Sequence, residues 1–145
     1  MEINGLPLHP LVVHAAVVFG PLGALLALGY VALPARRDRL RLPMLGLAVV
    51  AGLSILAAYV TGHYFLNSRP ELRQLPGVST HRARARVTLV VAFVFTAVAI
   101  VTAWLHTRTG AVRTLLLTLL GLSALGTLVM VVLTGDAGAR AVWGQ

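Results

Sequence analysis

The stretch that decides the fold is TLLLTLLGLSALGTLVMVVLT, residues 114–134, in which no side chain is charged. At about 1.5 Å per residue, a helix of this length crosses the ~30 Å hydrocarbon core of a bilayer. Three further apolar segments precede it, at about 10–33, 43–66 and 87–105. The sequence therefore predicts a single membrane domain over 1–145, with transmembrane helices at about 10–33, 43–66, 80–106 and 112–134.

The composition supports lipid as the solvent of this chain. Its 145 residues are 58% hydrophobic and 11% charged, whereas a soluble domain carries about 25% charged residues. All twelve basic residues are Arg, and they lie in the connections rather than in a stripe with stacking aromatics. This distribution argues against nucleic-acid binding and makes the bilayer the expected partner.

The lengths of the connections predict the topology. Those near 34–42 and 106–113 are short, so successive helices should be antiparallel neighbours in an all-α, up-down-up-down four-helix bundle. Both termini and the longer 67–80 connection then share one side. Six Arg fall on each side of the membrane, so the count of basic residues that the positive-inside rule uses does not determine the orientation. The dense Arg in the first connection favours termini outside.

An internal repeat suggests a tandem duplication of a helical hairpin. His9 and His81, 72 residues apart, open the first and third helices. Thr61-Gly62 and Thr134-Gly135, 73 residues apart, close the second and fourth, and we expect both pairs to stop their helices. Chance similarity between apolar helices is the competing explanation.

The main functional signal is a group of histidines on one membrane face. In an antiparallel bundle, four of the five histidines fall on the side of the termini together with Asp136; they are His9, His14, His63 and His81. Ionisable groups at membrane depth are costly and are candidates for function. The fifth, His106, lies beside Trp104 at the opposite interface, where we expect an aromatic-belt residue.

Imidazoles from facing helices can hold haem iron axially. Because cysteine is absent, covalent c-type haem, iron–sulfur clusters and thiolate sites are excluded. The favoured reading is a b-type haem in electron transfer, with His81 and either His9 or His14 as ligands. Arg82 and Arg86 are then the candidates for pairing with the haem propionates.

Two alternatives stay open. The first is a non-haem copper, zinc or iron site made by His9, His14, His63 and His81. The second is a structural or transport subunit without a cofactor, in which the histidines and arginines only anchor helix ends. No catalytic motif is present and the chain has four carboxylates, so we predict no catalytic residues and no enzyme activity of the chain on its own.

The chain resembles a bacterial membrane family, the domain of unknown function DUF2231. The resemblance rests on GLPLHPLVVH at 5–14, on His81 opening the third helix, and on TGDAGARAVWG at 134–144. It implies a four-helix protein of the bacterial plasma membrane, and some relatives occur beside Rieske-type or other redox modules. A b-type haem and a redox-protein partner or homo-oligomer are therefore expected. His9, His14 and His81 occupy motif positions, whereas relatives often carry an acidic residue at the position of His63.

Overall fold

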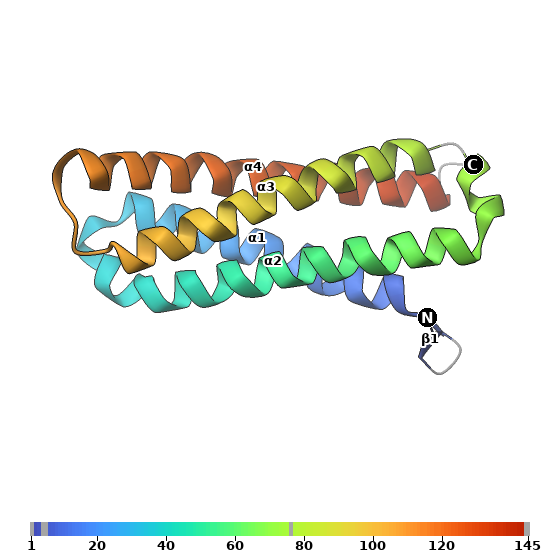
Figure 1. Ribbon diagram of the computed structural model, residues 1–145, viewed down its shortest axis with the longest axis horizontal. Coiled ribbons are helices and arrows are strands. Elements are labelled where there is room, and N and C mark those ends of the chain that lie inside the picture. Colours follow the sequence, from blue (N-terminus) through green and yellow to red (C-terminus); the bar gives the residue numbers. More distant parts are fainter. Residues whose placement is uncertain (1, 4–5, 76, 144–145) are drawn as a thin grey trace.

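Four long helices make up nearly all of the protein in Figure 1. The structure is a computed structural model and describes residues 2–3, 6–75 and 77–143. The helices are α1 (Leu8–Ala32), α2 (Arg37–Ser68), α3 (Val78–Trp104) and α4 (Gly110–Trp143). Each is long and apolar enough to cross a membrane. The predicted fold class is therefore confirmed.

Short elements complete the chain. The 3₁₀ helix η1 (Pro34–Arg36) joins α1 to α2, and η2 (Pro70–Gln74) lies between α2 and α3. Near the N-terminus β1 (Glu2–Ile3) pairs antiparallel with β2 (Leu6–Pro7). The backbone reverses before α3 at Gly77, whose φ of 88° suits a residue without a Cβ.

The helices form the predicted up-down-up-down bundle. α1 packs most extensively against α2, and α3 against α4, so the bundle consists of two hairpins. α1 also contacts α4, and α2 contacts α3, which leaves α1 and α3 diagonally opposite each other. In Figure 1 both termini and the α2–α3 connection lie at one end, here called the terminal end. The α1–α2 and α3–α4 connections lie at the other, here called the loop end.

The predicted helix stops at glycine are wrong. α2 continues through Thr61-Gly62 to Ser68, and α4 continues through Thr134-Gly135 to Trp143 rather than ending near 134. A glycine stops a helix by adopting positive φ, and among the described residues only Gly77 and Gly110 do so. The extension of α4 also carries an ion pair one turn apart, Asp136 with Arg140 at 3.0 Å.

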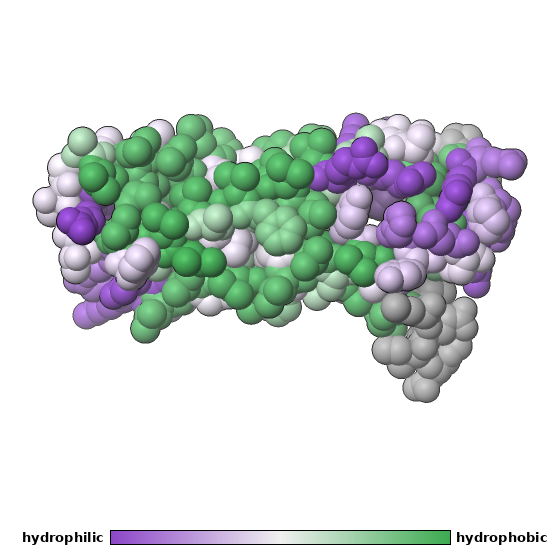
Figure 2. Space-filling view, in the orientation of Figure 1, coloured by the Kyte–Doolittle hydropathy of each residue, from purple (hydrophilic) through white to green (hydrophobic). Residues whose placement is uncertain are grey.

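Small side chains bring the helices together. The larger buried cluster lies towards the loop end and is dominated by alanines around Tyr30, Met44, Phe95 and Leu120. A smaller cluster nearer the terminal end consists of Ala16, Ile55, Ala92 and Val131. Close packing on small residues is typical of membrane helices. Large apolar side chains instead face outward, and Figure 2 shows them as a band between hydrophilic ends.

Candidate functional site

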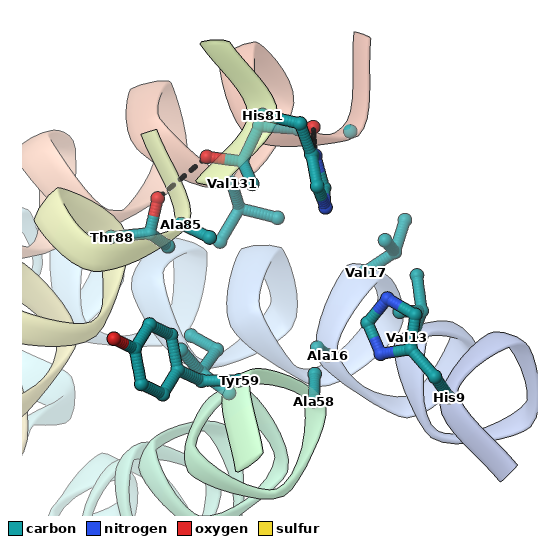
Figure 3. A pocket seen from close by; sticks show the side chains of 13 residues that line it. His9, Val13, Ala16, Val17, Ala58, Tyr59, His81, Ala85, Thr88 and Val131 are labelled. Atoms are coloured by element: carbon teal, nitrogen blue, oxygen red, sulfur yellow. Dashed lines mark hydrogen bonds between the residues drawn. The ribbon is translucent and has the colours of Figure 1, made fainter. Parts of the chain in front are cut away.

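A cavity of about 80 Å³ lies between the two hairpins near the terminal end. Its inner wall includes Ala16, Ile55 and Val131, which also form the smaller buried cluster. The other lining residues are mostly apolar and include two histidines: His9, Val13, Val17, Ala58, Tyr59, His81, Ala85, Thr88, Thr134 and Gly135. In Figure 3 His9 on α1 and His81 on α3 turn their rings into the space between the hairpins.

Thr61 on α2 fixes the orientation of the His9 imidazole. The Thr61 hydroxyl donates to the carbonyl of Ala57 at 2.7 Å. Its oxygen is then free to accept from Nδ1 of His9 at 3.3 Å. The proton of the neutral ring therefore sits on Nδ1, and Nε2 carries a free lone pair. Gly62 makes room for the ring, because a Cβ at that position would lie 2.8 Å from its Cε1 atom.

His81 is oriented in the same way through a different partner. Its Nδ1 lies 3.0 Å from the backbone carbonyl of Thr134 on α4. A carbonyl only accepts, so Nδ1 is the donor and Nε2 again carries the lone pair. The ring also packs on Gly138, where an added Cβ would lie 3.1 Å from Cε1. In its neutral form each cavity histidine would therefore carry the free lone pair on Nε2.

These contacts are equivalent in the two halves of the chain. His9 bonds to residue 61 and His81 to residue 134, each on the second helix of its own hairpin. The internal repeat in the sequence aligns these same residues, His9 with His81 and Thr61 with Thr134. The acceptor differs, because Thr61 uses its hydroxyl while Thr134 uses its backbone oxygen and bonds its hydroxyl to Thr88 at 2.7 Å.

The other two clustered histidines do not join this pair. His14 is exposed and its Nδ1 bonds to the carbonyl of Pro10, one turn earlier on the same helix, at 2.7 Å. His63 is exposed and lies edge-on to Tyr64. Over the part of the chain that the structure describes, no three His, Asp or Glu side chains come together in a metal-binding group. The structure therefore gathers two of the four predicted histidines.

The arginines on α3 also differ in exposure and contacts. Arg82 and Arg86, the two propionate candidates, are exposed. Arg84 instead reaches α4, where its NH1 donates to the carbonyl of Leu133 at 2.8 Å and lies 3.8 Å from the Asp136 carboxylate. The sequence did not predict that Arg84, rather than Arg82 or Arg86, contacts α4, although helical spacing puts residues 84, 85 and 88 on the face of His81.

A second polar cluster at the loop end was also missed. His106 is not a belt residue; only 13% of its side chain is exposed. Its Nε2 donates to the Asp38 carboxylate at 2.6 Å, and in the neutral ring Nδ1 accepts from the Tyr30 hydroxyl at 2.7 Å. This network joins α1, α2 and the α3–α4 connection. His106 is 76 residues from Tyr30 and 68 from Asp38, so no local pattern indicates that it meets them.

Fold and cavity together define a four-helix membrane protein with a pair of inward-facing histidines. The chain matches the family described as predicted membrane protein (DUF2231) over residues 5–145 and therefore belongs to it. Comparisons with curated proteins and with solved structures found no match.

Proposed function

We propose that this protein holds a b-type haem between His9 and His81 and transfers electrons within the bacterial plasma membrane. The observation that carries the proposal is the pair of Nε2 lone pairs presented to one cavity from diagonally opposite helices. Bound this way, a haem would supply a one-electron couple. Of the two ligand candidates on the first helix, His9 lines the cavity and His14 does not.

The hydrogen bonds to Nδ1 support a role as iron ligands. A metal-bound histidine usually donates its second ring N–H to a carbonyl, carboxylate or similar acceptor, which orients the ring and raises its basicity. His9 and His81 already make such bonds, to Thr61 and to the Thr134 carbonyl. These bonds orient the two rings before any metal binds and, in the neutral form, leave Nε2 as the nitrogen that would bind it.

The cavity is smaller than a haem needs, so haem binding requires the bundle to open. Pockets for ligands of cofactor size measure about 300–1,000 Å³, and the cavity here measures about 80 Å³. The donor set fits a haem, but the hairpins must separate at the terminal end to admit it. The larger buried cluster lies on the loop-end side of Ala16, Ile55 and Val131, so this separation leaves most of the packing intact.

Substitution of single histidines tests the proposal. After purification in detergent with added haem, the protein should show a Soret band that shifts on reduction with dithionite. His9→Ala and His81→Ala should each abolish the band. His14→Ala and His63→Ala are the matched controls and should retain it, because both side chains are exposed. Retention of haem by His81→Ala would contradict the proposal.

A non-haem metal ion is the second candidate, and the small volume of the cavity favours it. Two imidazoles and a cavity of about 80 Å³ suit a copper, zinc or iron ion with a water molecule better than a porphyrin. Elemental analysis distinguishes the two, because a colourless protein with stoichiometric metal supports the ion. A protein with neither metal nor haem would support the cofactor-free structural or transport role.

The electron-transfer proposal also implies a partner. Electrons must arrive from, or pass to, a redox protein or a second copy of this chain at the terminal end, since His9 and His81 lie there. Crosslinking in native membranes, followed by identification of the attached protein, tests this part. An isolated monomer that still exchanges electrons with a soluble donor would show that no dedicated partner is needed.

A further inference from the structure

Over the part of the chain that the structure describes, the loop end carries a large excess of positive charge. Its six basic residues are Arg36, Arg37, Arg39, Arg41, Arg108 and Arg113. Among the described residues the only acidic side chain at this end is Asp38, and His106 occupies it at 2.6 Å. At the terminal end, by contrast, Asp136 pairs with Arg140 at 3.0 Å and with Arg84 at 3.8 Å.

Three of the loop-end arginines make hydrogen bonds to backbone carbonyls. Arg37 donates to the carbonyls of Tyr30 and Val31, Arg41 to that of Ala103, and Arg113 to that of Arg108 at 2.8 Å. These bonds position the guanidinium groups without cancelling their charge. The loop end is therefore a surface with an excess of fixed cations.

An open depression of about 520 Å³ lies on this surface, at the α3–α4 connection. It is lined by Trp104, Leu105, Thr107, Arg108 and Thr109. The lining combines three polar side chains, a guanidinium and two hydroxyls, with an apolar layer made by the indole of Trp104 and the side chain of Leu105. Trp104 is 79% exposed, and the outward face of α3 next to it includes Ile100 and Val101.

We propose that this depression binds the headgroup of an anionic phospholipid. The phosphate would lie against Arg108, which lines the depression, with Arg113 beside it through the bond to the Arg108 carbonyl. Guanidinium groups form charge-assisted hydrogen bonds with phosphate oxygens. The acyl chains would lie along Trp104 and the exposed apolar face of α3. Tryptophan at a helix end belongs at the level of the headgroups, and basic clusters at that level attract anionic lipids. The apolar layer selects a lipid over a free phosphate.

The two tryptophans provide the test. Trp143→Phe leaves Trp104 as the sole reporter at the loop end, and Trp104→Phe leaves Trp143 at the terminal end. Each full-length variant is reconstituted in phosphatidylcholine vesicles that contain an equal small fraction of brominated phosphatidylglycerol or brominated phosphatidylcholine. We expect Trp104 to be quenched severalfold more by the anionic lipid, and Trp143 to show a smaller preference because Asp136 pairs with Arg84 and Arg140 at the terminal end.

Arginine substitutions locate the site. Arg108→Gln with Arg113→Gln, made in the Trp143→Phe background, should remove the preference of Trp104 while the circular dichroism of the helices is unchanged. The matched control is Arg36→Gln with Arg39→Gln, which removes the same charge from the same end but outside the depression, and which should keep most of the preference. Millimolar inorganic phosphate should not compete. Equal quenching by the two lipids, equal loss in both double variants, or displacement by free phosphate would overturn the proposal.

Discussion

At the scale of single residues, one hydroxyl group distinguishes the two cavity histidines. The Thr61 hydroxyl donates a hydrogen bond to the Ala57 carbonyl and accepts one from His9, so in the neutral ring its side chain leaves Nε2 as the free nitrogen. For His81 the backbone oxygen of Thr134 has the same role. A substitution that removes only the hydroxyl should therefore affect the two sites differently.

Thr61→Val keeps nearly the same shape and removes the acceptor of His9 Nδ1. We expect haem affinity, followed by titration of the Soret absorbance, to fall about 10- to 100-fold, as is typical when a partner behind the metal ligand is lost. Thr134→Val is the matched control and should change affinity little, because the carbonyl that accepts from His81 is retained. Equal losses in the two variants would contradict the assigned hydrogen bonds.

The two exposed arginines of α3 give a second prediction at this scale. If Arg82 and Arg86 pair with haem propionates, changing both to Gln should weaken haem retention during gel filtration and leave membrane insertion unchanged. Arg84→Gln is the control for lost charge, since Arg84 already bonds to α4. Unchanged haem content in the double variant would mean that these arginines only flank the helix.

At the scale of helices, the repeated Thr-Gly pairs show how equivalent sequence positions acquire different packing. A Cβ at Gly62 would meet the His9 ring at 2.8 Å, whereas one at Gly135 would meet nothing within 4 Å. In the second hairpin the glycine against the imidazole is Gly138 instead. Helix packing has therefore shifted the contact by about one turn between the two hairpins.

This difference predicts opposite effects of alanine. Gly62→Ala should displace His9 and destabilise the protein by about 1–3 kcal/mol, the usual cost of overpacking. Gly135→Ala should stabilise it by about 0.5–1 kcal/mol, because alanine is the better helix former. Denaturation in mixed micelles measures both without requiring a cofactor. Destabilisation by Gly135→Ala would contradict the packing described here.

The sequence predicted those features that depend on residues close together in the chain. Apolar runs and short connections are local, so the four spans and their antiparallel order were predicted correctly. His9 and His81 lie at the starts of α1 and α3, so the antiparallel order correctly predicted that they lie at the same end of the bundle. Exposure is not local: the sequence does not show that His14 and His63 face outward, because this depends on the rotation of α1 and α2 against their neighbours. The Tyr30–His106–Asp38 network was missed for the same reason.

At the scale of the whole molecule, the fold predicts which segments share a side of the membrane. The chain has no cysteine, so a single introduced thiol can be labelled without background. Ser68→Cys and Arg36→Cys lie at opposite ends and are both exposed. With the termini outside, an impermeant maleimide should label Ser68→Cys in intact cells and Arg36→Cys only after lysis. Labelling of both variants in intact cells would contradict the four-span topology, whereas the reverse pattern would only invert the orientation.

The bonds that orient the two imidazoles each stay inside one hairpin. His9 is oriented by α2 and His81 by α4, so each ring takes its orienting hydrogen bond from its own hairpin. Such a hairpin is a self-contained half-site, and two copies meeting about a two-fold axis along the membrane normal would already present a facing pair of imidazoles. When the two copies are joined in one chain, each half can diverge. The acceptor for His9 is a side chain and the acceptor for His81 is a backbone carbonyl. A dimer of identical hairpins could not acquire this asymmetry.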